Sequence, residues 1–274
     1  MRRTVAKVKR PFGNLHFEVT GQGPPLIFAH GLGGNQMSWW QQVAHFAPHY
    51  TCVTFAHRGF APSDAVAGGG PNPENYAGDL SAIIEDLGFR EVFLVGQSMG
   101  GWTVLEYAFA YPNRVHALVL SSTSGTIDRR GADPSGGTDY DAWQADAEAK
   151  AQAGLRDGIH PALGRAAAEK SPALHLLYKH IDDMAAGTLD KERVRAGLRR
   201  TAQRTVEEFE EFRVPTLLIA GGQDIVFPPF LASAIAAKLP SADAKVIPDA
   251  GHSPYFEDAA TFNRLVEEFL SLHR

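Results

Sequence analysis

Cysteine is nearly absent from this chain, which has 274 residues and a single cysteine, Cys52. One thiol cannot form an internal disulfide, so we expect the fold to be held by a sizeable apolar core. Cys52 lies in an apolar strand-like run, which predicts a buried structural thiol. The chain also lacks closely spaced Cys and His residues of the kind that hold metal ions. We therefore expect no metal and no cofactor.

Long apolar runs and blocks of basic charge are missing as well. No stretch approaches the roughly 18–20 apolar residues of a membrane span. The basic N-terminus lacks the apolar segment of a signal peptide and predicts a first strand instead. The formal net charge is −5, and without a basic patch we expect no binding to nucleic acid or to membranes. These features favour a soluble cytoplasmic protein that acts on a small molecule, with self-association left open.

A Gly-x-Ser-x-Gly sequence at residues 96–100 carries the strongest functional signal in the chain. It follows a strand-like run at residues 91–95 and precedes a helix-like run at residues 99–110. In that setting it predicts a sharp turn that raises the serine hydroxyl above the end of a sheet. The flanking glycines make room for a strained backbone. We therefore predict that Ser98 is a nucleophile.

A serine hydroxyl is a weak nucleophile and needs a base, together with a third group that orients the base. Asp224 and His252 each follow an apolar strand-like run later in the chain. Ligands of open α/β sheets bind at the carboxyl ends of strands, which is where both residues are expected. Two other acids compete with Asp224. We expect Asp249 to be a turn residue and Asp128 a surface loop residue.

Four motifs together resemble those of the α/β-hydrolase family over nearly the whole chain. They are His-Gly-Leu-Gly-Gly at residues 30–34, Gly-Gln-Ser-Met-Gly-Gly at residues 96–101, Gly-Gly-Gln-Asp at residues 221–224 and Ala-Gly-His at residues 250–252. The resemblance implies that Ser98 is the nucleophile, His252 the general base and acid, and Asp224 the orienting carboxylate. It also implies an oxyanion hole formed by the backbone N–H groups of Leu32 and Met99.

One stretch departs from the family's pattern. Relatives often carry Asp-x-Arg-Gly-x-Gly-x-Ser where residues 56–63 read Ala-His-Arg-Gly-Phe-Ala-Pro-Ser. Ala56 replaces the aspartate, and Ala61 replaces a glycine. Because that aspartate usually belongs to the scaffold, we expect altered local hydrogen bonding and an intact catalytic triad.

The order of elements indicates an α/β fold with a mostly parallel, doubly wound sheet. Apolar runs typical of parallel strands buried on both faces occur at residues 25–29, 51–55, 91–95 and 115–121. Helix-like stretches separate them, as crossover connections require. Residues 4–9 and 15–19 alternate about a turn at residues 10–14, which predicts an antiparallel hairpin at the sheet edge.

Residues 125–212 interrupt this alternation and predict a helical cap inserted into a core domain formed by residues 1–124 and 213–274. Helix-favouring sequence without a strand pattern occurs at residues 140–153, 160–169, 174–184 and 191–212. The family resemblance implies that such a cap covers the active site. Its alanine, leucine and aromatic content suggests a small or medium apolar substrate.

Three tryptophans and two histidines could border that site. Trp39 follows the His-Gly-Leu loop, Trp102 begins the helix after the nucleophile, and Trp143 lies in the predicted cap. Each is either a substrate contact or a core residue, the commoner role of aromatic side chains at helix positions. We expect His30 to orient its loop by hydrogen bonding, and His57 to be structural or part of the pocket wall.

We predict a serine hydrolase that cleaves a carboxylic ester or a lactone through an acyl-enzyme. A C–C bond hydrolase of ring-cleavage diketones would use the same triad, but tryptophan commonly follows the catalytic histidine there, and this chain has Ser253. A cofactor-free perhydrolase or haloperoxidase is another alternative, and a small-molecule receptor or a lyase is a remote one. A serine at position 98 argues against epoxide hydrolases and dehalogenases, which use an aspartate nucleophile.

Overall fold

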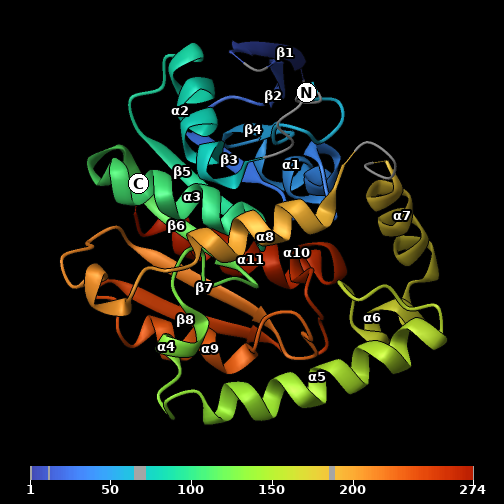
Figure 1. The fold of residues 1–274 in the computed structure, drawn as a ribbon. Coiled ribbons are helices and arrows are strands. Elements are labelled where there is room, and N and C mark those ends of the chain that lie inside the picture. The colour runs from blue at the N-terminus through green and yellow to red at the C-terminus, as the bar shows by residue number, and fades with distance from the viewer. Residues whose placement is uncertain (1, 12, 65–71, 185–188, 274) are drawn as a thin grey trace.

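An eight-stranded sheet runs through the part of the molecule that the structure describes (Figure 1). The structure is a computed structural model, and it describes residues 2–11, 13–64, 72–184 and 189–273. In spatial order the strands are β1, β2, β4, β3, β5, β6, β7 and β8. Their bounds are β1 Arg3–Arg10, β2 Gly13–Thr20, β3 Pro25–Ala29, β4 Thr51–Phe55, β5 Val92–Gln97, β6 Val115–Ser121, β7 Thr216–Gly221 and β8 Ala242–Ile247.

The sheet is parallel except at one end. Neighbouring strands from β4 through β3 to β8 pair in parallel. β1 and β2 form an antiparallel hairpin, and β2 joins β4 in antiparallel fashion. Phe12, in the predicted turn, lies outside the described residues. The predicted α/β class, the mostly parallel sheet and the hairpin are thereby confirmed.

Helices cover both faces of the sheet, so that two apolar layers sandwich it. On β5, Leu94 packs into a cluster shared with α2 and α3, whereas Phe93 and Val95 pack into one shared with α1 and α11. Burial on both faces explains the unbroken apolar run of this strand. The bounds of the helices that follow the core strands are α1 Trp40–Phe46, α2 Tyr76–Asp86, α3 Met99–Ala110, α9 Pro229–Ala236, α10 Pro254–Glu257 and α11 Ala259–Ser271.

The last helix shows how local sequence sets an element. The Asp258 carboxylate accepts a hydrogen bond from the Thr261 backbone N–H at 3.1 Å and caps the N-terminus of α11. Phe262, Val266 and Leu270, each four residues apart, are buried against the sheet. The helix predicted from this spacing is present. None of the helices in the described ranges is long and apolar enough to cross a bilayer.

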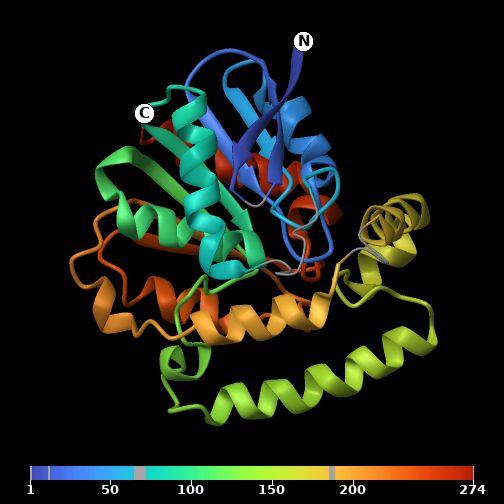
Figure 2. The same cartoon turned by 45° about the horizontal axis from the view of Figure 1, so that its top comes forward.

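Between β6 and β7 the described chain is helical and lies outside the sheet. In Figures 1 and 2, α5 lies on the side of the molecule opposite β1, and α8 crosses nearer the sheet. The bounds of these elements are α4 Arg129–Ala132, α5 Thr138–Arg156, α6 Arg165–Lys170, α7 Pro172–Asp183, α8 Lys191–Thr201 and the 3₁₀ turn η4 Val206–Phe209.

The helix predicted over residues 191–212 is wrong in its second half, because α8 ends at Thr201. Arg204 instead pairs with Ile127 in an isolated parallel bridge. Its guanidinium binds the Glu106 carboxylate of α3 through two contacts, 2.6 Å from Nε and 2.9 Å from Nη2. This two-point ion pair with a distant helix fixes an extended backbone where local propensity favours a helix.

Charged side chains decorate both edges of the sheet. On β1, Arg3 pairs with Glu18 of the neighbouring strand at 2.7 Å. On β8, Lys245 pairs with Asp243 at 2.8 Å, and both are exposed. Polar side chains therefore border the backbone at each end of the sheet.

Candidate active site

Ser98 forms the whole turn between β5 and α3. Its φ of 50° and ψ of −117° lie in a region that few residues with a side chain adopt. Glycines on either side permit the turn. A Cβ on Gly100 would lie 2.0 Å from the carbonyl oxygen of Ala29, and one on Gly96 would lie 2.6 Å from that of Gly100. The sharp turn expected from the Gly-x-Ser-x-Gly sequence is therefore present.

Three side chains from separate loops form a hydrogen-bonded row at this turn. Ser98 Oγ lies 2.9 Å from His252 Nε2, and His252 Nδ1 lies 2.9 Å from Asp224 Oδ2. Asp224 Oδ1 accepts hydrogen bonds from the backbone N–H groups of Val226 and Phe227, at 2.7 and 2.9 Å. These bonds fix the carboxylate so that Nδ1–H donates to it, which leaves Nε2 as the acceptor for the serine proton.

The two competing acids lie elsewhere, as expected. Asp249 is exposed in the turn that follows β8. Asp128 caps the N-terminus of α4, where its carboxylate accepts hydrogen bonds from the backbone N–H groups of Arg130 and Gly131. The carboxylate beside His252 is that of Asp224, which is 3% exposed.

The loop after β3 lies against the Ser98 turn. A Cβ on Gly31 would lie 3.2 Å from the Cβ of Ser98, so the two backbones are close. Leu32 and Ser98 line the same cavity. Met99 is the first residue of α3, so its N–H has no partner within the helix. The loop and the helix start thus bring the two predicted oxyanion donors to the neighbourhood of the hydroxyl.

Two buried histidines, His30 and His57, form hydrogen bonds that hold the loop after β3. His30 Nδ1 lies 2.7 Å from the carbonyl oxygen of Gly31, and His30 Nε2 lies 3.0 Å from both the backbone nitrogen and Nδ1 of His57. Burial lowers the pKa of His30 to about 4 and the pKa of His57 well below its usual value. Both rings are therefore neutral at neutral pH, and His30 orients its loop as expected.

The stretch that departs from the family's pattern is held by other partners. Arg58 binds Asp79 of α2 through Nε and Nη2, both at 2.5 Å. The Asp79 carboxylate, almost fully buried, also accepts a hydrogen bond from Arg10 at 3.0 Å. Ser63 Oγ donates to the carbonyl oxygen of Ala56 at 2.7 Å. The change at position 56 thus leaves an ordered network and does not reach the Ser98 row.

A cavity of about 190 Å³ opens at Ser98. Its walls come from the loop after β3, the Ser98 turn, the His252 loop and the segment between β6 and β7. The lining residues include Leu32, Gly33, Gln97, Ser98, His160, Pro161, Tyr178, Asp182, Lys191, Arg195, Val226 and His252. Lys191 Nζ lies 2.7 Å from Asp182 Oδ1, so these two charges on the wall offset each other.

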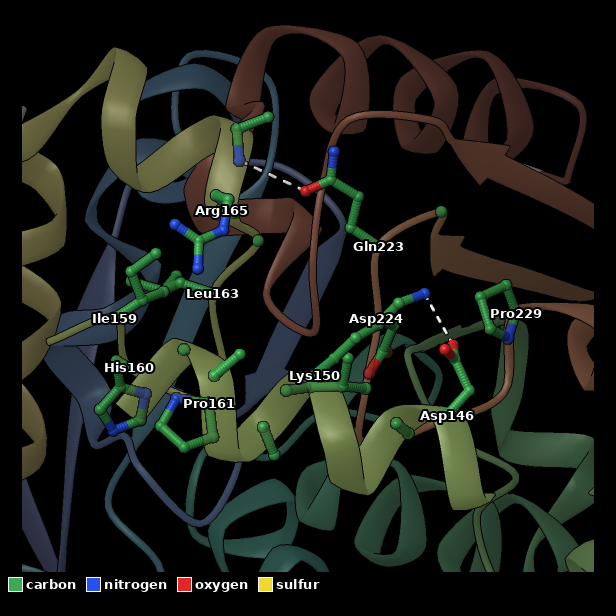
Figure 3. Close-up of a pocket in the computed structure, with 18 of the residues that line it drawn as sticks. Asp146, Lys150, Ile159, His160, Pro161, Leu163, Arg165, Gln223, Asp224 and Pro229 are labelled. Carbon is green, nitrogen blue, oxygen red and sulfur yellow. Dashed lines mark hydrogen bonds and ion pairs between the residues drawn. The ribbon is translucent and has the colours of Figure 1, made fainter. Parts of the chain in front are cut away.

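A larger cavity of about 550 Å³ shares part of the wall of the first and is bordered by α5. Figure 3 shows it between α5, residues 159–166 and the loop that follows β7. His160 and Pro161 line both cavities. Small side chains of α5, among them Ala147 and Ala151, form part of the wall. The two spaces therefore share residues 160–161 as part of their walls.

The three predicted tryptophans occupy different places. Trp39 is fully buried, with ring centroids 5.1 Å from Phe28 and 4.3 Å from Tyr255. Of the two roles that the sequence left open for Trp39, this is the core role. Trp102 packs against a small apolar cluster that includes Met99. Of the three, only Trp143 is among the described lining residues of the two cavities, and it lines the larger one.

Two polar contacts near His252 were missed in the sequence. Gln97 Nε2 donates to the carbonyl oxygen of His252 at 2.9 Å, and Ser253 Oγ lies 3.2 Å from the hydroxyl of Tyr178 on α7. Gln97 stands inside the Gly-x-Ser-x-Gly motif, but nothing local reveals its distant partner. Among the described residues, no group of three or more His, Cys, Asp or Glu side chains is arranged to hold a metal ion.

Comparison with known proteins agrees with this geometry. The chain is 27% identical to 3-oxoadipate enol-lactonase 2 of Acinetobacter baylyi, across 92% of this chain and 91% of that protein. It is 26% identical to a 2-hydroxy-6-oxononadienedioate/2-hydroxy-6-oxononatrienedioate hydrolase of Burkholderia vietnamiensis, across 93% and 90% of the two chains. A thermophilic esterase from Thermogutta terrifontis superposes with a TM-score of 0.75 and 25% identity over all of both chains. The family model of the alpha/beta hydrolase fold matches residues 24–259. As its motifs predict, the chain therefore belongs to the α/β-hydrolase fold family.

Proposed function

We propose that this protein is a serine hydrolase that cleaves carboxylic esters or lactones through an acyl-enzyme. The observation that carries the proposal is the row of Ser98, His252 and Asp224, with 2.9 Å between partners, of which Ser98 and His252 line a cavity. The names of the relatives, an enol-lactonase and an esterase, agree with hydrolysis of this kind. The catalytic roles follow from the order of donors and acceptors in the row.

In the first step, His252 Nε2 takes the proton from Ser98 Oγ as the oxygen attacks the substrate carbonyl carbon. The carbonyl oxygen becomes an anion, and the N–H groups of Leu32 and Met99 stabilise it. The C–O bond to the leaving group then breaks, and His252 delivers its proton to the departing alkoxide. Water, deprotonated by His252, then attacks the acyl carbon. The bond from that carbon to Ser98 Oγ breaks, His252 returns the proton to Oγ, and the acid is released. Asp224 orients the imidazole and stabilises its charged form in both halves.

The two cavities suggest how a substrate is accommodated. The carbonyl group would lie in the smaller cavity at Ser98, and an apolar acyl or alcohol group would extend past residues 160–161 into the larger one. Trp143, Ala147 and Ala151 would then contact that group. In this proposal residues 125–212 act as a cap over a core of residues 1–124 and 213–274. The cytoplasmic location remains a prediction, and self-association is left open.

Alternatives with the same triad differ in substrate. C–C bond hydrolysis is less favoured, because this chain has Ser253 where that subgroup has a tryptophan. Ser253 contacts Tyr178. Perhydrolase or haloperoxidase activity would require the same nucleophile and would accompany ester hydrolysis. A panel of p-nitrophenyl esters, lactones and ring-cleavage diketones separates the hydrolytic activities, since each substrate reports a different bond.

Labelling with a fluorophosphonate tests the nucleophile directly. The reagent should phosphonylate one residue stoichiometrically, and peptide mapping should place the added mass on Ser98. Ser124, which is fully buried and has no hydrogen-bond partner for its hydroxyl in the described structure, should stay unmodified because the reagent does not reach it and no base activates it. A folded protein that is not labelled, or is labelled at another serine, would contradict the proposal.

A bulky residue in the larger cavity should change which acyl chain lengths the enzyme prefers in its ester substrates. Replacing Ala151 with tryptophan should lower kcat/KM for p-nitrophenyl octanoate by about 10-fold or more, because the side chain fills the space of the acyl group. Hydrolysis of the acetate should persist. Ala149→Trp is the matched control, since Ala149 is exposed on the same helix. Equal losses on both esters, or no loss on either, would remove the larger cavity from the substrate path.

A further inference from the structure

Glu257, the last residue of α10, accepts three backbone hydrogen bonds. Its Oε2 accepts hydrogen bonds from the backbone N–H groups of Gly164 at 2.7 Å and Gly251 at 2.9 Å. Its Oε1 accepts one from the N–H of Ser253 at 2.9 Å. Gly251 and Ser253 stand on either side of His252. Gly164 belongs to the segment between β6 and β7. One carboxylate thus joins both flanks of His252 to the segment that borders the cavities.

The backbones that meet at Glu257 are in direct contact. A Cβ on Gly251 would lie 2.2 Å from the backbone nitrogen of Gly164, and one on Gly164 would lie 2.9 Å from the nitrogen of Gly251. Gln223, beside Asp224, adds a further link because its Oε1 accepts a hydrogen bond from the backbone N–H of Ala166 at 3.3 Å. A small movement of residues 164–166 would therefore also displace the two loops that carry Asp224 and His252.

Stability alone is a poor reason for a carboxylate at this place. Burial raises the pKa of Glu257, and the nearby charge of Asp224 acts in the same direction. The ionised group is therefore held at an electrostatic cost, which the three N–H donors offset. The carboxylate instead fixes the relative positions of three backbone segments, because its two oxygens accept hydrogen bonds from three N–H groups at once.

We propose that Glu257 is a positioning residue that aligns His252 with Ser98 through the backbone on both sides of the imidazole. Alignment then also depends on Gly164 being seated against the His252 loop, so the inserted segment takes part in assembling the catalytic row. Proton transfer from Ser98 Oγ to His252 Nε2 requires the present 2.9 Å contact. The inference rests on the proposed hydrolytic function, but it concerns the placement of His252 and is testable without a substrate.

Glu257→Gln is the first test. The amide keeps the shape of the side chain but replaces one acceptor oxygen with an NH₂ group, which cannot accept a hydrogen bond. We expect kcat for p-nitrophenyl acetate to fall by about 10- to 100-fold with KM nearly unchanged, as for a small misplacement of a catalytic group. The downfield proton NMR signal of the His252–Asp224 hydrogen bond should shift or broaden in the free enzyme.

Asp258→Asn is the matched control. Asp258 is the next residue, and its carboxylate caps α11 through Thr261 without contacting the His252 loop. This variant should lower the melting temperature and leave kcat and the proton signal unchanged. If Glu257→Gln fails to fold, Gly164→Ala makes the same test, because its Cβ would push Gly164 away from Gly251.

Several outcomes would overturn the inference. Wild-type kcat in folded Glu257→Gln would do so, and so would a loss of kcat that tracks melting temperature equally in both acid variants. A wild-type protein that hydrolyses no ester would refute the proposed function instead. In that event the proton signal decides the role of Glu257: a changed signal supports positioning, and an unchanged one overturns it.

Discussion

Ser98→Ala should lower kcat for a p-nitrophenyl ester by about 10⁶-fold, as removal of the nucleophile does in other serine hydrolases. The mutation deletes the oxygen that attacks the carbonyl carbon, while His252 and Asp224 keep their hydrogen bond. Alanine retains the Cβ, so the backbone at φ 50° experiences the same constraint as in the wild type. Far-UV circular dichroism and the melting temperature should therefore change little.

The residual rate of the variant is informative as well. A rate above that in water, by about 10³- to 10⁴-fold, would indicate that the oxyanion donors and substrate binding act without the nucleophile. Turnover within a few-fold of the wild type would exclude the acyl-enzyme route. Loss of activity together with loss of the folded state would not support it, which is why both measurements are made on one preparation.

Asp224→Asn should reduce kcat by about 10⁴-fold, the size of effect seen when the acid of such a triad becomes an amide. Oδ1 accepts two backbone N–H groups, from Val226 and Phe227, so the amide oxygen will take that place. The NH₂ group will then occupy the position 2.9 Å from His252 Nδ1 and donate to it. This places the imidazole proton on Nε2, where it blocks acceptance of the proton from Ser98.

One control variant and one further measurement test the role of Asp224. Asp249→Asn changes an exposed carboxylate in the same loop as His252 and should leave kcat unchanged. KM of Asp224→Asn should change much less than kcat, because asparagine keeps the size of the side chain that lines the larger cavity. If kcat for Asp224→Asn stays within a factor of ten of the wild type, Asp224 is not the orienting acid.

The parts of the fold that local sequence controls were predictable. Runs such as the one just before Gly96 are apolar on both faces, and their alternation with helices predicts a parallel sheet. The candidate row was predictable because Ser98, Asp224 and His252 each follow such a run. Prediction failed where the local structure depends on contacts with residues that are distant in sequence. Arg204 leaves the helical pattern because Glu106, almost a hundred positions earlier, binds its guanidinium.

The residues that hold the site in place could not be predicted for the same reason, because their partners are distant in sequence. Nothing near Glu257 in sequence indicates that its carboxylate meets the N–H group of Gly164. Trp39 follows a functional loop in the chain, yet its ring points into the core against Tyr255. Side-chain direction and long-range contacts, which propensity and periodicity do not encode, decided these cases.

The charges along β1 and β8 have a consequence for how copies of this protein meet. Unpaired backbone at a sheet border is a template on which a foreign strand can dock and seed fibres. Here such a strand would bring its own side chains against Arg3 and Glu18 at one border, or Asp243 and Lys245 at the other, and strip water from them. Self-association, if it occurs, should therefore proceed through the helical faces rather than by continuation of the sheet.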